Sequence, residues 1–118
     1  VVATSLMSVR AREAAERLSA AGGPSVSVVN VTRITPSPWR EIAALVDGRE
    51  FAVFLDESRG PGSPASYLLA RVAETDPGAR LRLVCCADAP SPFSTALLDE
   101  IVPTVERIEE SLREAAAG

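Results

Sequence analysis

Residues 51–55, Phe-Ala-Val-Phe-Leu, form an almost unbroken apolar run. A short run of this kind predicts a strand that is covered on both faces, as in a parallel sheet with helices on each side. Residues 81–86 have the same character, and the valine-rich segments 1–4 and 25–31 predict two further strands. The residues after Leu55 are expected to form a loop that ends at Ser63.

Helical patterns separate and follow these strands. Apolar and charged residues alternate at three- and four-residue spacing from Leu6, with Ser5 as the expected N-cap. The predicted helices span residues 6–21, 39–46, 64–74, 94–101 and 104–117. Alternating strands and helices predict right-handed βαβ units, and hence one α/β domain over residues 1–118: a three-layer α/β/α fold with a mostly parallel sheet.

The composition excludes much of the catalytic repertoire. The chain of 118 residues has no His, and all 12 of its basic residues are Arg. Without Lys there is no Walker-type phosphate loop and no Schiff base, and without His there is no His-based nucleophile pair or zinc site. The formal net charge of −4 and the scattered arginines argue against nucleic acid as a partner.

Hydropathy and cysteine content indicate the cellular compartment expected for the protein. No apolar run has the length of a membrane span, and no signal-peptide pattern occurs at the start, so no membrane partner is expected. Cys85 and Cys86 are adjacent and point to opposite faces of a strand. They are interpreted as small buried apolar residues in a reducing, cytoplasmic environment.

Ligands of such sheets bind beyond the carboxyl ends of the strands. If the first and third strands are neighbours, the relevant loops follow Thr4 and Leu55. Residues 58–63, Ser-Arg-Gly-Pro-Gly-Ser, precede a helix and form either an ordinary tight connection or a site for a small anion or nucleotide. The acids Asp56, Glu57 and Asp88 are expected to cap helices or face solvent rather than act as general acids or bases.

Three aromatic residues have a structural and a functional interpretation. Trp39 is expected to pack against its own loop, and Tyr67 to lie in the core. Phe93, between Pro92 and Ser94, either packs locally or projects from its loop as an interface anchor. Across the whole sequence, we predict no catalytic residue, no cofactor-binding residue and no metal ligand.

Several segments resemble, in order, one known family. They are Val-Ala-Thr-Ser-Leu-Met at 2–7, Arg-Glu-Ala-Ala-Glu-Arg-Leu at 12–18, the valine strand with Arg and Ile-x-Pro at 26–38, Phe-Ala-Val-Phe-Leu-Asp-Glu-Ser at 51–58, Asp-Ala-Pro-Ser-Pro-Phe at 88–93 and Val-Pro-Thr-Val-Glu-Arg-Ile-Glu-Glu-Ser-Leu at 102–112. The chain resembles the C-terminal domain shared by transketolases and the beta subunits of 2-oxoacid dehydrogenases, such as pyruvate dehydrogenase. The segment 88–93 favours the dehydrogenase branch.

The resemblance implies a domain of a longer enzyme that depends on thiamine diphosphate. The family sheet has four parallel strands and an antiparallel edge strand, which would precede Val1. Thiamine diphosphate and magnesium are held by other domains of such enzymes, so this domain is expected to bind no cofactor and to be inactive alone. Its implied role is organisational, at a homodimer or domain interface and at the active-site entrance. Candidate residues for that role are Glu57, Arg59, Asp88 and Phe93.

The chain departs from the family in two places. Pro61 separates Gly60 from Gly62 where the family turn has paired glycines. The histidine common in this domain of sugar-phosphate transketolases is absent, which argues against phosphosugar handling by this segment.

Overall fold

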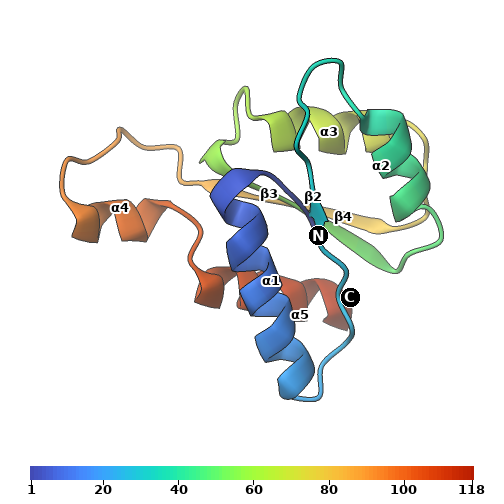
Figure 1. Ribbon diagram of the computed structural model, residues 1–118, viewed down its shortest axis with the longest axis horizontal. Coiled ribbons are helices and arrows are strands. Elements are labelled where there is room, and N and C mark those ends of the chain that lie inside the picture. Colours follow the sequence, from blue (N-terminus) through green and yellow to red (C-terminus); the bar gives the residue numbers. More distant parts are fainter.

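Four strands form one sheet in the computed structural model, which describes residues 1–118 (Figure 1). They are β1 (Val2–Ala3), β2 (Val29–Asn30), β3 (Phe51–Arg59) and β4 (Arg80–Cys86). Their order is β2-β1-β3-β4, and all neighbouring pairs are parallel. The first and third strands are therefore neighbours, and the loops that follow them meet at one edge of the sheet.

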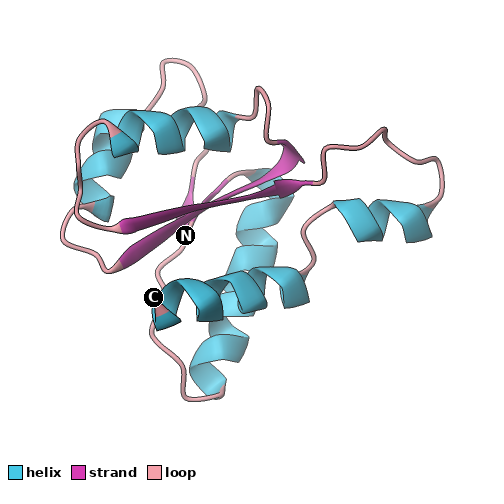
Figure 2. Cartoon of the chain, turned by 180° about the vertical axis from the view of Figure 1, so that it is seen from behind, coloured by secondary structure: helices cyan, strands magenta, loops and turns pink.

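Helices cover both faces of the sheet. The chain forms α1 (Ser5–Ala20), α2 (Trp39–Val46), α3 (Pro64–Ala73), α4 (Thr95–Ile101) and α5 (Val105–Ala117). Figures 1 and 2 show α2 and α3 on one side of the sheet and α1 and α5 on the other. The prediction of a three-layer α/β/α fold with a parallel sheet is confirmed.

Alternate residues of β3 point into two separate cores, because successive strand side chains face opposite ways. Val53 and Leu55 lie in the cluster formed with α1 and α5. Ala52 and Phe54 lie in the cluster formed with α2 and α3. All four are buried, so the predicted strand at 51–55 is covered on both faces.

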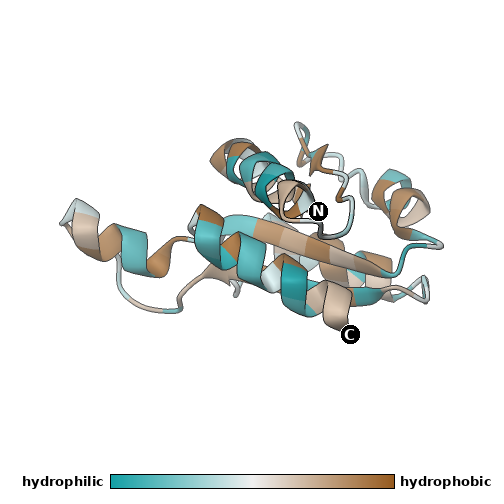
Figure 3. Ribbon diagram, turned by 90° about the horizontal axis from the view of Figure 1, so that it is seen from below, coloured by the Kyte–Doolittle hydropathy of each residue, from teal (hydrophilic) through white to brown (hydrophobic).

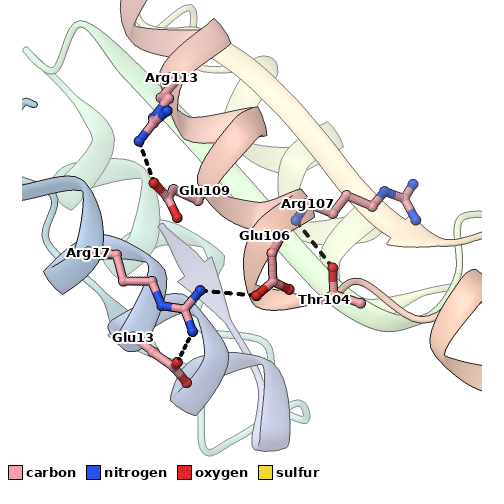
Figure 4. A network of polar contacts seen from close by, with 7 residues as sticks. All are labelled: Glu13, Arg17, Thr104, Glu106, Arg107, Glu109 and Arg113. Atoms are coloured by element: carbon pink, nitrogen blue, oxygen red, sulfur yellow. Dashed lines mark hydrogen bonds and ion pairs between the residues drawn. The ribbon is translucent and has the colours of Figure 1, made fainter. Parts of the chain in front are cut away.

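Polar contacts join α1 and α5, the two helices that share one face of the sheet. The Arg17 guanidinium on α1 donates to Glu13 at 2.6 Å and to Glu106, in the first turn of α5, at 3.0 Å (Figure 4). Glu109 and Arg113 form a further pair along α5. All of these side chains except Glu109 are substantially exposed, so the network adds orientation to helix packing that the apolar core already provides.

Trp39 is held between two cations. The guanidinium carbons of Arg40 and Arg71 each lie 4.4 Å from the centre of the indole ring. Arg71 belongs to α3, so the ring joins α2 to α3 as well as packing locally.

Some predicted boundaries are wrong. The strand expected at 25–31 is confined to Val29–Asn30, because its partner β1 has only two residues with which to pair. The third strand continues to Arg59 instead of ending at Leu55, since a shift of register lets Arg59 pair with Cys86. The N-cap of α1 is Thr4 rather than Ser5, and its side chain makes no capping hydrogen bond.

Tyr67 was expected in the core but lies on the outer face of α3, about half exposed. The residues of α3 that are buried are Ala65, Leu68 and Val72, which share one face at three- and four-residue spacing. Tyr67 falls outside that face.

Candidate functional site

Two connections meet at the carboxyl edge of the sheet. The first runs from the end of β3 to α3, and the second follows β4. Arg59 joins them: its Nε donates to the carbonyl oxygen of Ala89 at 2.7 Å, and its Nη2 donates to the same oxygen and to Ser91 Oγ, the latter at 2.9 Å. The sequence-predicted residue Arg59 therefore lies against the loop that carries the predicted residues Asp88 and Phe93.

Asp56 is a buried carboxylate at this edge, only 2% exposed. Its Oδ1 accepts from the backbone N–H of Ser58 at 2.9 Å, and its Oδ2 accepts from that of Ala65 at 3.2 Å. Ala65 is the second residue of α3, whose first amides have no partner within the helix. Asp56 thus caps a helix, as predicted, while the adjacent Glu57 is exposed.

Ser63 completes the start of α3. Its Oγ accepts from the backbone N–H of Ser66 at 3.0 Å, and Ser66 Oγ donates to the carbonyl oxygen of Gly60 at 2.6 Å. The Sγ of Cys85 lies 3.6 Å from Ser63 Oγ. Burial is the main cause that raises the pKa of the Cys85 thiol, which keeps it protonated at neutral pH. Cys86 is also buried, and both cysteines are free, as expected.

Residues 58–63, considered above as a site for a small anion or nucleotide, have few free polar groups with which to bind such a ligand. Asp56 and Ser63 already accept from the first-turn amides of α3, and the Arg59 guanidinium is bound to the loop after β4. These contacts support the interpretation of this segment as a tight connection. No three side chains of the His, Cys, Asp and Glu types group closely enough to hold a metal ion.

A shallow recess of about 390 Å³ opens beside this edge. It is bordered by the segment after β2 and by the start of α3, and its lining residues are Ile34, Thr35, Ser37, Gly62, Ser63, Pro64 and Tyr67. Its lining includes both hydroxyl-bearing and apolar side chains and no charged residue.

A projecting segment, residues 87–102, is named here the arm. The backbone N–H of Ala87 donates to the carbonyl oxygen of Ile101 at 2.9 Å, which closes the arm at its base. Figures 1 and 2 show α4 standing away from the rest of the molecule. None of the α4 residues is buried, although it is capped by Ser94, whose Oγ accepts from Leu97 N–H.

The arm carries apolar side chains that are wholly or partly exposed. Phe93 is fully exposed, and Leu97 and Leu98 are 49% and 37% exposed. Figure 3 shows this mixture of apolar and polar residues along the projecting helix. Two interpretations of Phe93 were left open, local packing and projection from its loop, and its full exposure agrees with the second. Leu97 and Leu98 were missed, because a seven-residue helix is too short for its periodicity to reveal which face is covered.

The four predicted residues therefore fall into three settings. Arg59 holds the base of the arm, and Asp88 and Phe93 are exposed on the arm itself. Glu57 is exposed at the end of β3, two residues before Arg59. The structure brings Arg59 to the loop of Asp88 and Phe93, whereas the Glu57 side chain forms no hydrogen bond or ion pair.

This architecture defines a three-layer α/β/α domain from which an exposed arm projects. At the carboxyl edge of its sheet, Arg59 is hydrogen-bonded to the base of that arm. The family model described as transketolase, C-terminal domain, matches residues 1–108, and the chain belongs to this family. The family expected from the sequence is thereby confirmed.

Comparison with solved structures supports the fold. A structure described as a split gene transketolase, an inactive beta4 tetramer, matches 98% of this chain with a TM-score of 0.84 and 22% sequence identity. The present chain spans 38% of the length of that one. No curated protein matched the sequence. None of the helices has the length and apolar character needed to cross a lipid bilayer.

Proposed function

We propose that this chain is a non-catalytic, organisational domain of a thiamine-diphosphate-dependent enzyme, which contributes to subunit association and borders the active-site entrance. The observation that carries the proposal is that the side chains of Asp56 and Arg59 are already hydrogen-bonded within the chain. These two charged groups lie at the carboxyl edge, where ligands of such sheets usually bind. Both are bonded within the chain: Asp56 accepts from backbone amides of β3 and α3, and Arg59 donates to the loop after β4.

The residues of this edge do not fit a cofactor site for magnesium and a diphosphate. Magnesium is held by oxygen ligands, chiefly carboxylates and phosphates. Both oxygens of the buried carboxylate of Asp56 accept backbone hydrogen bonds, and no further acid joins it in a cluster. Thiamine diphosphate and magnesium are therefore assigned to other domains of the parent enzyme.

The family supports a domain within a larger assembly. The chain spans 38% of the length of the matching transketolase, and that protein is a tetramer. We assign this domain to the C-terminal part of a cytoplasmic parent enzyme, where it associates with other domains or with a second copy. The segment 88–93, Asp-Ala-Pro-Ser-Pro-Phe, favours a dehydrogenase beta-like parent over a transketolase. Glu57, Arg59, Asp88 and Phe93 are the interface or entrance candidates.

Calorimetric titration of the 118-residue chain with thiamine diphosphate and magnesium chloride tests the proposal. We expect no saturable heat, and no decarboxylation of 2-oxo acids by the isolated chain. Saturable binding with one site per chain would contradict the proposal. A thermal shift with phosphate-bearing ligands that Arg59→Ala abolishes would instead support the alternative, a small-anion or nucleotide site at residues 58–63.

A further inference from the structure

We propose that Ser91 is a phosphorylation site and that Arg59 binds the phosphate group, so that phosphorylation fixes the arm against the end of β3. The phosphoryl donor is a nucleoside triphosphate, used by a protein kinase that acts on a serine followed by a proline. The inference goes beyond the proposed function and does not depend on it, since it concerns only residues of the arm and of β3. Three observations support it: the accessibility of Ser91, its contact with Arg59, and the absence of the same combination elsewhere in the chain.

Ser91 lies in the part of the arm that has no regular secondary structure. It is exposed, and it stands between Pro90 and Pro92, ahead of α4. Proline has no backbone N–H and disfavours a helical backbone in the residue before it, so the two prolines keep this stretch extended. Figure 1 shows the segment between β4 and α4 running clear of the other helices. A kinase needs such a segment, because the attacking hydroxyl has to be placed in line with the triphosphate.

The Arg59 guanidinium is already in contact with the acceptor hydroxyl. Its Nη2 donates to Ser91 Oγ at 2.9 Å, while its Nε donates to the carbonyl oxygen of Ala89 at 2.7 Å. No carboxylate pairs with Arg59, so its positive charge is not neutralised. A phosphoserine carries a charge of about −1.5 to −2 near pH 7 and three acceptor oxygens, which suit the paired N–H donors of an arginine. A phosphate on Ser91 therefore forms within reach of an unpaired cation.

The other charged residues of the arm are all negative. They are Asp88, Asp99 and Glu100, and all three are exposed and form no ion pair. A phosphate on Ser91 adds to this negative charge. Arg59 is the only cationic side chain that is hydrogen-bonded to the arm, so it alone is placed to offset the added charge.

Three other hydroxyl-bearing residues directly precede a proline, and none shares this setting. Ser63 is only 2% exposed and caps α3, and the Oγ of Ser37 is buried. Thr35 is exposed, but no arginine donates to it. Ser91 therefore combines an exposed hydroxyl, a following proline and a bonded guanidinium, which the other three do not.

The reaction is a phosphoryl transfer. Ser91 Oγ attacks the γ-phosphorus of the nucleoside triphosphate, and the bond between that phosphorus and the β–γ bridging oxygen breaks. The nucleoside diphosphate leaves, and the Oγ proton passes to a carboxylate of the kinase. Arg59 takes no part in the transfer and binds the phosphate afterwards. The arm then gains charge-assisted hydrogen bonds to β3, which are stronger than the present bond to a neutral hydroxyl.

Incubation of the 118-residue chain with a recombinant proline-directed protein kinase, ATP and magnesium chloride tests the site. Mass spectrometry of proteolytic peptides should locate a phosphoryl group at Ser91 and none at Ser37 or Ser63. Ser91→Ala should abolish the modification of this peptide. Ser94→Ala is the matched control, because Ser94 is exposed on the same arm and does not precede a proline; it should leave the modification unchanged. A folded chain that is not modified at Ser91 overturns the proposal.

The role of Arg59 is tested on a chain that carries phosphoserine at position 91, incorporated during translation. Phosphorus NMR should give a second pKa of the phosphate below about 5.5 instead of the ordinary value of about 6, because a nearby cation favours the dianion. Arg59→Ala should return this pKa to about 6 or above, and Arg59→Lys should restore part of the decrease. Arg107→Ala is the control, since Arg107 is exposed and forms no ion pair; it should leave the pKa unchanged.

Amide hydrogen exchange of the same phosphorylated chain gives a second readout. Exchange in residues 87–102 should be slower than in the unmodified chain by about fivefold, and only when Arg59 is present. A phosphate pKa or an exchange rate that is the same with and without Arg59 overturns the proposal. Neither measurement involves thiamine diphosphate, so these outcomes are separate from the calorimetric test of the proposed function.

Discussion

Arg59 and Ala89 are joined by two hydrogen bonds to a single carbonyl oxygen, with Arg59 Nε at 2.7 Å and Nη2 as the second donor. The residues are 30 positions apart, one at the end of β3 and the other in the arm. A charged donor of this kind forms a stronger contact than a neutral one. The contact therefore fixes the orientation of the arm relative to the sheet.

Arg59→Ala should loosen the arm without disturbing the core. We expect the free energy of unfolding to fall by about 1 kcal/mol, the usual contribution of such a partly exposed hydrogen bond. Amide hydrogen exchange should become faster in residues 87–102 and stay unchanged in β1 and α5. Arg107→Ala is the control, because the Arg107 side chain is exposed and forms no ion pair. Equal exchange in the two variants would contradict a role for Arg59 in holding the arm.

Asp56→Asn should destabilise the domain, because an amide offers one acceptor oxygen where the carboxylate offers two. The buried Asn side chain then leaves one of the amides of Ser58 and Ala65 without its partner, at a cost of about 1–3 kcal/mol. Urea denaturation at neutral pH measures this loss. The neighbouring substitution Glu57→Gln changes an exposed acid and should alter stability by no more than about 0.5 kcal/mol. If both variants unfold at the same urea concentration, Asp56 does not act as a buried cap.

The contact between Glu106 and Arg17 predicts a pH dependence. A hydrogen bond from its own backbone amide, followed by the Arg17 guanidinium, holds the pKa of Glu106 below its ordinary value of 4.5. Because the folded state has the lower pKa, the stabilisation is fully present above pH 4.5 and is lost as the pH falls through the folded value. Glu106→Gln should therefore lower the Tm at neutral pH and have no effect in strongly acidic solution.

The control for this pH series is Glu110→Gln, which removes an exposed acid from the same helix that forms no ion pair. It should change the Tm little at any pH. A difference between wild type and Glu106→Gln that persists in strong acid would show that the side chain acts by a means other than its charge.

The two cysteines should be unreactive while the chain is folded. Cys85 and Cys86 are buried, and burial raises the pKa of the Cys85 thiol above its ordinary value of 9.0, so little thiolate forms near pH 8. A disulfide reagent should modify both thiols only after unfolding in guanidinium chloride. The variant Ser19→Cys, with a third thiol at an exposed position near the end of α1, should react immediately in the folded state. Rapid native labelling of wild type would mean that the end of β4 opens readily.

The layered fold was predictable because its signals are local. The run at 51–55 is short and apolar at every position, which is typical of a strand covered on both faces. The helix at Trp39–Val46 was predicted with the observed bounds. The extension of β3 to Arg59 was not predictable, because it depends on pairing with Cys86, far away along the chain. The two-residue length of β2 is likewise set by its neighbour β1.

The candidate site was predictable only in part. Asp56, at the end of an apolar run, was predicted to cap a helix or face solvent, and its buried contact with the backbone of Ala65 agrees with a cap. The bonding of Arg59 to Ala89 carries no sequence signal, since any exposed Arg near a loop has the same appearance. The exposure of Leu97 and Leu98 was not predictable either, because their surroundings depend on the path of the arm.

The Ala87–Ile101 hydrogen bond brings the two ends of the arm together, so that the arm projects from the sheet and its covering helices as a separate segment. Because no residue from 88 to 100 is buried, its length and sequence can diverge during evolution without loss of the sheet or its two cores. Substitutions or insertions in this one segment would therefore alter the surface beside the carboxyl edge and leave the sheet and its two cores in place.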